Sequence, residues 1–140
     1  MKKNMHEIKH NGKLLAVRDS IHSYCPLGLS FYGGKEDAIQ VGKFRYDKGK
    51  KLRDHRHIVR PRVVEKTQEI LIVFKGSVKV TTYSQTGKEI VDECLLLEGD
   101  YYISYYGGVG FDVLEDDTRM LEIKPGTYLV DNDDLERELL

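Results

Sequence analysis

Residues 49–76 read GKKLRDHRHIVRPRVVEKTQEILIVFKG, and this stretch decides how the chain is interpreted. Two histidines, His55 and His57, stand two positions apart, and Glu69 opens an otherwise apolar run that ends before a glycine. Side chains alternate between the two faces of a strand, so the two imidazoles of a strand over residues 51–57 share one face. Imidazole and carboxylate groups are ligands that suit Zn, Fe, Mn or Ni. The stretch therefore predicts two strands that present these three groups to one cavity.

The composition indicates one ordinary domain. The chain has 140 residues, which is enough for a sizeable core, and a net charge of -1, which gives no general affinity for nucleic acid. Its two cysteines, Cys25 and Cys94, lie far apart in sequence, as is usual for reduced thiols of the cytosol. The N-terminus lacks the apolar run of a secretory signal, and no segment has the roughly 20 apolar residues that span a bilayer. We therefore expect a soluble, cytoplasmic protein with no membrane partner.

Short apolar segments separated by turn residues predict an all-β domain. Asn11-Gly12 favours a tight hairpin turn near the N-terminus, because both residues tolerate a positive φ. A polar, glycine-rich loop follows, and the remaining strands come at the short, regular spacing that is typical of a sandwich or barrel. The expected strands cover residues 29–32 within this loop and then residues 38–46, 51–57, 69–74, 77–83, 89–97, 101–104, 111–115 and 119–124. One or two helical turns are expected over residues 131–140, with Asp131 or Asp133 as the N-cap.

The order of glycine, two histidines, glutamate and glycine in the quoted stretch resembles the first motif of the cupin superfamily. The matching residues are Gly49, His55, His57, Glu69 and Gly76, and the gap before the glutamate is several residues longer than in the family pattern. The likeness extends over most of the chain from about residue 39 onward.

A second motif and the end of the chain add to the resemblance. Residues 98–100 (EGD) are similar to the start of the second cupin motif, and residues 105–110 (YYGGVG) are similar to its end. Val109 or Gly110 stands where the family has a histidine ligand. Residues 61–63, 67–69, 107–111 and 122–128 further resemble the signature of small cupins associated with bacterial surface-polysaccharide metabolism.

The resemblance implies a single antiparallel double-stranded β-helix, the jelly-roll barrel of cupins, with a short C-terminal helix. One cupin-like domain would then occupy residues 1–140, with an N-terminal hairpin and loop over 1–36, a barrel core over 37–128 and a tail over 129–140. Barrels of this type leave sheet edges that pairing between subunits protects, so we expect a homodimer. The hairpin around Asn11-Gly12 is the expected element of exchange.

The resemblance also implies a metal site. Its ligands would be His55, His57 and Glu69, and its metal a divalent Zn, Fe, Mn or Ni ion. Three protein ligands with a water molecule are a legitimate catalytic zinc arrangement. In this interpretation the two histidines are also the candidate catalytic residues.

Three further residues are candidates for binding a small molecule. Arg62 matches a Pro-Arg pair of the subgroup, and its guanidinium group suits phosphate or carboxylate oxygens, so an anionic ligand is expected. Tyr102 and Tyr105 belong to a tyrosine cluster in the second motif. Tyrosines in a pocket can stack on a sugar ring and hydrogen-bond its hydroxyl groups.

Three functions stay open at this point, and the sequence does not decide whether the protein is an enzyme. The first is a small-molecule-binding cupin that acts on an anionic sugar or related polar metabolite, with a metal that polarises a substrate oxygen or activates water. The second is a metal-independent, sugar-nucleotide ketoisomerase-like cupin in which His55 or His57 is the general acid or base. The third is a non-enzymatic ligand-binding cupin with a degenerate metal site, which Val109 in the place of a histidine favours.

Overall fold

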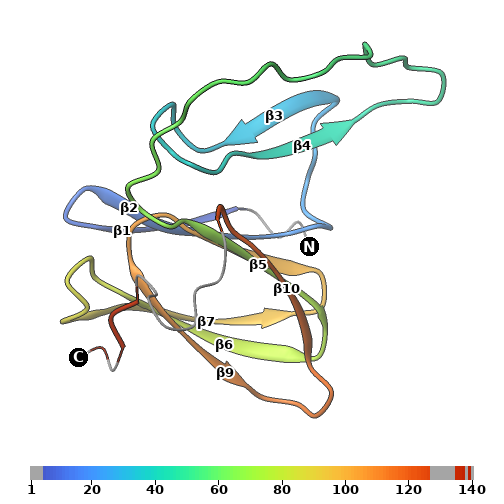
Figure 1. Ribbon diagram of the computed structural model, residues 1–140. Coiled ribbons are helices and arrows are strands. Elements are labelled where there is room, and N and C mark those ends of the chain that lie inside the picture. The colour runs from blue at the N-terminus through green and yellow to red at the C-terminus, as the bar shows by residue number, and fades with distance from the viewer. Residues whose placement is uncertain (1–4, 127–134, 138, 140) are drawn as a thin grey trace.

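The computed structural model describes residues 5–126, 135–137 and 139, and the described residues form ten strands and no helix (Figure 1). The prediction of an all-β chain is therefore confirmed. Every strand pairing is antiparallel. The strands are β1 (His6–His10), β2 (Lys13–Ser20), β3 (Gly28–Tyr32), β4 (Val41–Arg45), β5 (Glu69–Lys75), β6 (Ser77–Tyr83), β7 (Ile90–Leu97), β8 (Asp100–Ser104), β9 (Gly108–Val113) and β10 (Arg119–Ile123).

Two of the sheets pack face to face as a β-sandwich. One sheet has five strands in the order β1-β2-β8-β5-β10, and the other has three in the order β7-β6-β9. Because side chains alternate along each strand, one side of each sheet supplies a shared apolar core. The five-stranded sheet contributes Ile8, Ala16, Val73 and Tyr102, and the three-stranded sheet contributes Val78, Val80, Cys94 and Leu96.

The hairpin of β3 and β4 covers the outer face of the five-stranded sheet. Val17, Ile70 and Ile103 form the buried centre of this second apolar layer, and Tyr32 and Val41 of the hairpin pack against it. All five residues of β8 are buried, because this strand lies in the middle of the sheet and both of its faces are covered. The predicted short strand over residues 29–32 is confirmed as β3.

The hairpin continues into an extended segment, and together they form the arm, which we define as residues 28–66. The arm lies above the sandwich in Figure 1, and its segment 46–66 contains no strand. The predicted strand over residues 51–57 is therefore wrong. Residues 47–66 carry eight Lys or Arg against three Asp or Glu, and no described strand lies beside them to supply ladder hydrogen bonds and apolar contacts.

The N-terminal hairpin belongs to the sandwich. Asn11 and Gly12 turn it with φ values of 51° and 77°, which confirms the predicted turn. Strand β2 pairs with β8 inside the five-stranded sheet. We expected a hairpin and loop over residues 1–36 and a barrel core over 37–128. The structure is divided differently, because the arm separates the two parts of the sandwich in the sequence.

The predicted C-terminal helix is absent from the described residues. Residues 135–137 have no regular structure, and Asp131 and Asp133 lie outside the part of the chain that the structure describes. A segment this short falls below the roughly 12–15 residues that an isolated helix needs. No described segment forms a helix of the length and apolar character needed to cross a membrane.

Candidate functional site

The two histidines of the predicted metal site lie on the arm and are exposed. Their rings approach each other edge to face, with centroids 5.4 Å apart, and His55 Nδ1 lies 3.0 Å from the carbonyl oxygen of Arg53. Segment 46–66 is not part of a sheet, so nothing turns these rings toward the interior of the sandwich. The prediction that His55 and His57 lie on a strand and face the interior is therefore wrong.

Glu69, the third predicted ligand, begins β5 opposite Ser104 and is half buried. Among the described residues, no three His, Cys, Asp or Glu side chains are grouped so that they can hold a metal ion. Val109, predicted to lie at a vacant ligand position, pairs with Thr82 on β6 and packs against the sandwich core. The residues of the predicted metal site therefore do not fit a metal in this arrangement.

Two of the predicted ligand-binding residues lie in the sandwich core and on the arm. Tyr102 is fully buried in the sandwich core, and its hydroxyl group is 2.8 Å from that of Thr82. Burial raises its pKa far above the usual value for tyrosine. Arg62 is exposed on segment 46–66. Neither side chain belongs to the cavity that Tyr105 lines.

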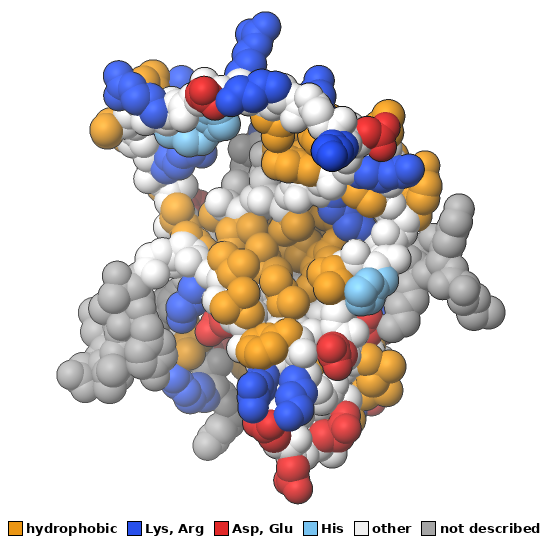
Figure 2. All heavy atoms as spheres, turned by 90° about the vertical axis from the view of Figure 1, so that its right-hand side faces the viewer, with side chains coloured by type: hydrophobic (Ala, Val, Ile, Leu, Met, Phe, Trp, Pro, Cys, Tyr) orange, Lys and Arg blue, Asp and Glu red, His pale blue; other side chains and the backbone are white. Residues whose placement is uncertain are grey.

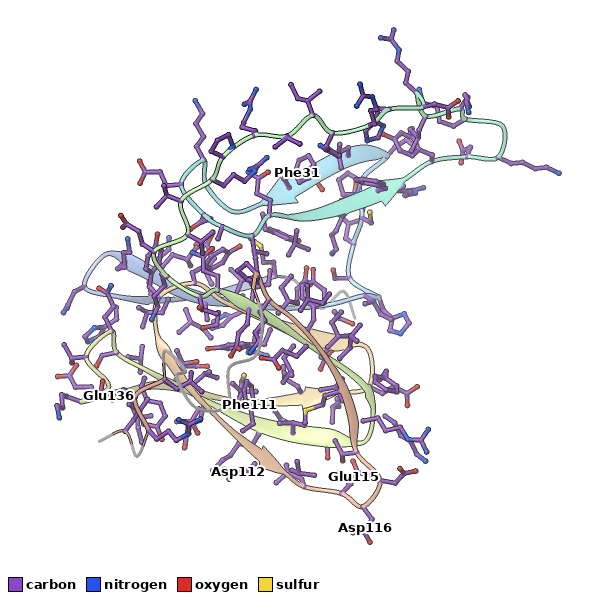
Figure 3. The ribbon with its side chains drawn as sticks, viewed as in Figure 1. Phe31, Phe111, Asp112, Glu115, Asp116 and Glu136 are labelled. Carbon is purple, nitrogen blue, oxygen red and sulfur yellow. The ribbon has the colours of Figure 1, made fainter. Side chains whose placement is uncertain are left out.

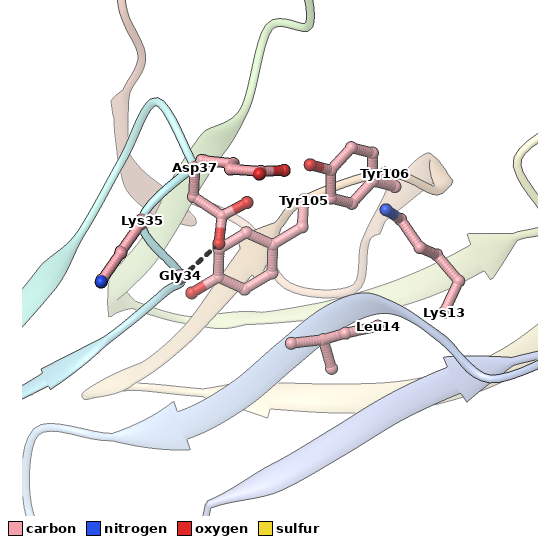
Figure 4. Close-up of a pocket in the computed structure, with 8 residues that line it drawn as sticks. Lys13, Leu14, Gly34, Lys35, Asp37, Tyr105 and Tyr106 are labelled. Atoms are coloured by element: carbon pink, nitrogen blue, oxygen red, sulfur yellow. Dashed lines mark hydrogen bonds between the residues drawn. The ribbon is translucent and has the colours of Figure 1, made fainter.

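The third, Tyr105, lines a cavity of about 490 Å³ between the outer face of the sandwich and the base of the arm (Figure 4). Three pieces of chain meet there, namely the start of β2, the loop after β3 and the connection between β8 and β9. The lining residues are Lys13, Leu14, Gly34, Lys35, Glu36, Asp37, Tyr105 and Tyr106. We take this cavity as the candidate functional site.

Tyr105 supplies the most unusual group of the cavity. The backbone N–H groups of Tyr105 and Tyr106 both donate to the carbonyl oxygen of Leu15, which fixes where the connection between β8 and β9 begins. In Figure 4 the Tyr105 ring reaches toward the loop that carries Gly34 and Asp37. Its hydroxyl oxygen is buried and has no hydrogen-bond partner among the described residues. Buried polar groups are nearly always paired, so this hydroxyl needs a partner.

The Tyr105 hydroxyl stays protonated in this environment. Burial, together with the negative charge of Asp37, raises its pKa to about 12. A neutral phenol both donates and accepts a hydrogen bond. The group can therefore pair with a hydroxyl, a carbonyl or a water, and at neutral pH it is not a ligand that a metal would favour.

Tyr106 and Lys13 form a second feature of the cavity. The Lys13 Nζ atom lies 3.7 Å from the centroid of the Tyr106 ring. This contact holds the ammonium group beside an aromatic face, an arrangement that is attractive by cation–π electrostatics. Slight burial and the neighbouring carboxylates of Asp37 and Glu36 raise the pKa of Tyr106. The site thus combines a flat aromatic surface with a fixed cation.

Asp37 mainly holds the loop in place. Its Oδ2 atom accepts a hydrogen bond from Gly34 N at 2.6 Å, and its Oδ1 atom accepts one from Gln68 Nε2 at 2.9 Å. Gln68 is fully buried and accepts a further bond from Ile39 N at 3.2 Å. Both carboxylate oxygens are thus engaged, and the loop after β3 is tied to the start of β5.

A second cavity of about 260 Å³ adjoins this one and shares Glu36 and Tyr106 with it. Its other lining residues are Ala38, Val63, Val64, Glu65, Lys66 and Gln68. The end of segment 46–66 therefore forms the far wall of a continuous depression around the Tyr106 ring.

A buried polar network joins the hairpin of the arm to the sandwich. Asp19 on β2 accepts hydrogen bonds at its Oδ2 atom from Tyr32 at 2.9 Å, from Lys43 at 2.9 Å and from Tyr101 at 3.0 Å. Lys43 also donates to the hydroxyl of Ser23. Burial by itself raises the pKa of the Asp19 carboxyl, but the bonds from Lys43 and Ser23 outweigh it and hold that pKa below 3.8. The ion pair is therefore charged at neutral pH.

Sequence reasoning missed Lys13, the loop of residues 34–37 and the Asp19 network. The loop was expected only as part of a polar, glycine-rich connection. Asp19 did carry a signal, since it alternates with Val17 on one face of an apolar strand, and a carboxylate on such a face needs partners. The distant partners Lys43 and Tyr101 carry no such signal.

Comparisons of the chain with protein-family models, with curated proteins and with solved structures return no match.

Proposed function

We propose that the chain binds a small, hydroxylated ring compound of the sugar class in the cavity lined by Tyr105 and Tyr106. The observation that carries this proposal is the buried Tyr105 hydroxyl, which has no hydrogen-bond partner among the described residues, on a residue that lines a cavity of about 490 Å³. A ligand hydroxyl would satisfy it. The Tyr106 ring offers the aromatic surface on which sugar rings pack.

The expected anionic character of the ligand finds partial support in the lining. Lys13, Lys35, Glu36 and Asp37 all belong to the lining, so its formal charges balance. The Asp37 oxygens already accept hydrogen bonds from Gly34 and Gln68, which reduces their availability to a ligand. The ammonium groups of Lys13 and Lys35 and the carboxylate of Glu36 are therefore the charges left for a ligand, and a carboxylate on the sugar would suit the two ammonium groups.

Binding is proposed as the function in place of the metal-dependent or histidine-dependent reactions. Neither His55 nor His57 lines the cavity, and His55, His57 and Glu69 do not meet. Among the three functions left open by the sequence, a ligand-binding cupin with a degenerate metal site is thus the best supported. The antiparallel sheets are compatible with a cupin fold, and Gly76 and Gly99 stand at turns with φ values of 82° and 86°.

Isothermal titration calorimetry with glucose, glucuronic acid and UDP-glucuronic acid tests the proposal. We expect binding of at least one of the two uronic acids. Tyr105→Phe should weaken it about 2- to 12-fold, because one neutral hydrogen bond contributes roughly 0.5–1.5 kcal/mol. Lys13→Met should weaken the acids more than glucose.

Arg62→Ala is the matched control, because Arg62 was a candidate on sequence grounds but lies outside the cavity lining. It should bind as the wild type does. Absence of heat with all three compounds, or an unchanged affinity for Tyr105→Phe, would overturn the proposal.

A further inference from the structure

The hairpin of the arm presents an apolar face that points away from its own sandwich. Leu29 pairs with Phe44 across β3 and β4, and Phe31 lies on the same face two residues from Leu29. Leu29, Phe31 and Phe44 are 48%, 56% and 58% exposed. We call these three side chains the arm face, and Figure 3 labels Phe31 within it. Three large apolar groups on one small hairpin are more than a solvated surface normally carries.

The five-stranded sheet has an exposed apolar region on its outer face. Leu121 on β10 pairs with Ile72 on β5, and Ile123 pairs with Ile70, so their side chains share this face. Phe74 lies two residues beyond Ile72 on the same side. Phe74, Leu121 and Ile123 are 51%, 52% and 45% exposed. The β10 patch is defined as Ile72, Phe74, Leu121 and Ile123.

The β10 patch lies at an edge of its sheet, since β10 pairs only with β5 among the described strands. Figure 2 shows hydrophobic side chains gathered in a hollow between the arm and the sandwich. An exposed apolar edge of this kind favours pairing with another chain.

The segment 47–66 of the arm and the rest of the chain carry opposite net charges. Residues 47–66 carry a net charge of +5 with neutral histidines, and because the whole chain carries -1, the rest carries -6. Part of this negative charge lies in the turn between β9 and β10, at Glu115 and Asp116. Asp112 and Asp117 lie nearby, but they already form ion pairs within the same copy, with Lys79 and with Lys75 and Arg119 respectively. Figure 3 places Asp112, Glu115 and Asp116 at the end of the sandwich that is far from the arm. A basic arm and an acidic end on one chain attract the opposite parts of a second copy.

The arm of the same copy cannot cover its own β10 patch with the arm face. Tyr32 and Lys43 fix the hairpin to Asp19, with the arm face directed outward. Gln68, next to the start of β5, holds the loop between β3 and β4 through Asp37 and Ile39. The hairpin is thus attached to the five-stranded sheet at two places, and the arm face remains available to another molecule.

We infer that two copies of this chain associate with two-fold symmetry, and that the arm face of each copy covers the β10 patch of the other. In such an interface every contact between the arm face and the β10 patch occurs twice, once in each direction. The basic segment of each arm then approaches the acidic turn between β9 and β10 of its partner. The exchanged element is the arm, in place of the N-terminal hairpin around Asn11 and Gly12, which is held inside the sheet through β2 and β8.

Light scattering after size exclusion, at tens of micromolar protein, tests this inference with two single variants and their mixture. The wild type should have the mass of a dimer. Phe31→Glu on the arm face and Leu121→Lys on the β10 patch should each have the mass of a monomer. Both side chains are exposed within one copy, so the fold should persist, and circular dichroism verifies it.

An equimolar mixture of the two variants should recover the dimer mass. In the mixed pair, one interface is unaltered and the other sets the new glutamate against the new lysine. Leu95→Glu, on the exposed side of β7, is the matched control and should stay dimeric. A monomeric wild type, dimeric single variants, or a mixture that stays monomeric would each overturn the inference.

Discussion

The sandwich and the arm of this chain are stabilised in different ways. In the sandwich, Val73, Val78 and Val80 are completely buried between two sheets that cover each other. In the arm, Leu29, Phe31 and Phe44 are about half exposed, and Val59 is fully exposed. A buried core stabilises a fold within one copy, whereas exposed apolar side chains yield stability only when something covers them. The core of the sandwich is therefore formed within one copy, whereas the exposed side chains of the arm contribute stability only if another surface covers them.

The joint between these two regions is polar. Lys43 is only 12% exposed in its side chain and pairs with the almost fully buried carboxylate of Asp19. Such a pair contributes less net stability than an apolar contact of the same size, but it fixes orientation, because removal of one partner leaves a buried charge. The arm is thus held in one position without being part of the core.

Substitutions in the two regions should differ most in their effect on folding. Leu96→Ala, in the sandwich core, should lower the free energy of unfolding by about 2–5 kcal/mol through lost burial and a cavity. Val59→Ala, on the arm, should change it by no more than about 0.5 kcal/mol in dilute protein, where each copy is alone. Urea unfolding followed by circular dichroism measures both. A loss above that level for Val59→Ala would mean that the arm has a core of its own.

The polar joint should respond to the loss of its charge. Asp19→Asn removes the carboxylate and leaves Lys43 without its counter-charge, so we expect a cost of about 1–3 kcal/mol. Hydrogen exchange of β3 and β4 measures this cost. The exchange rate of these two strands should rise in the variant, while the exchange rate of β6 stays low.

The same joint gives the wild type a dependence on pH. The folded-state pKa of Asp19 lies below its ordinary value of 3.8, so its contribution is complete above about pH 4 and is lost as the pH falls through the folded-state pKa. The protection of β3 and β4 against exchange, expressed relative to the intrinsic exchange rate at each pH, should therefore fall in acid, and more steeply in the wild type than in Asp19→Asn. Equal acid profiles for the two proteins would contradict the assignment.

Two tyrosines, Tyr102 on β8 and Tyr105 directly after it, provide the smallest and most selective comparison. Tyr102→Phe removes a hydroxyl that is paired with Thr82, and should lower the free energy of unfolding by about 1 kcal/mol. Tyr105→Phe removes a hydroxyl with no partner among the described residues, and should leave that free energy unchanged or slightly higher. Thermal unfolding of the two variants without added sugar measures the difference. An equal loss in both would show that Tyr105 is a structural residue.

The sequence was sufficient for those parts of the fold that local patterns determine. The turn at Asn11 and Gly12 and the apolar run that became β5 have signatures within a few residues. The predicted histidine strand failed because alternation specifies a face only where a neighbouring strand exists, and segment 46–66 has none among the described strands.

The site was predictable only in part for a related reason. Tyr105 was a candidate because it belongs to a conspicuous cluster of tyrosines. Its partners in the cavity, Lys13 and Asp37, come from segments that are distant in the sequence, and only the folded topology brings them together. The buried state of Tyr102 likewise depends on the second sheet, which no local pattern reveals.

Hydrogen–deuterium exchange of the wild type at nanomolar and at tens of micromolar concentration tests the central claim most directly, namely that the arm is completed by a second copy. We predict that peptides covering β3, β4 and β10 exchange more slowly at the high concentration, and that peptides covering β6, inside the sandwich, exchange at the same slow rate at both. Exchange of the arm and of β10 that does not change with concentration would contradict the claim.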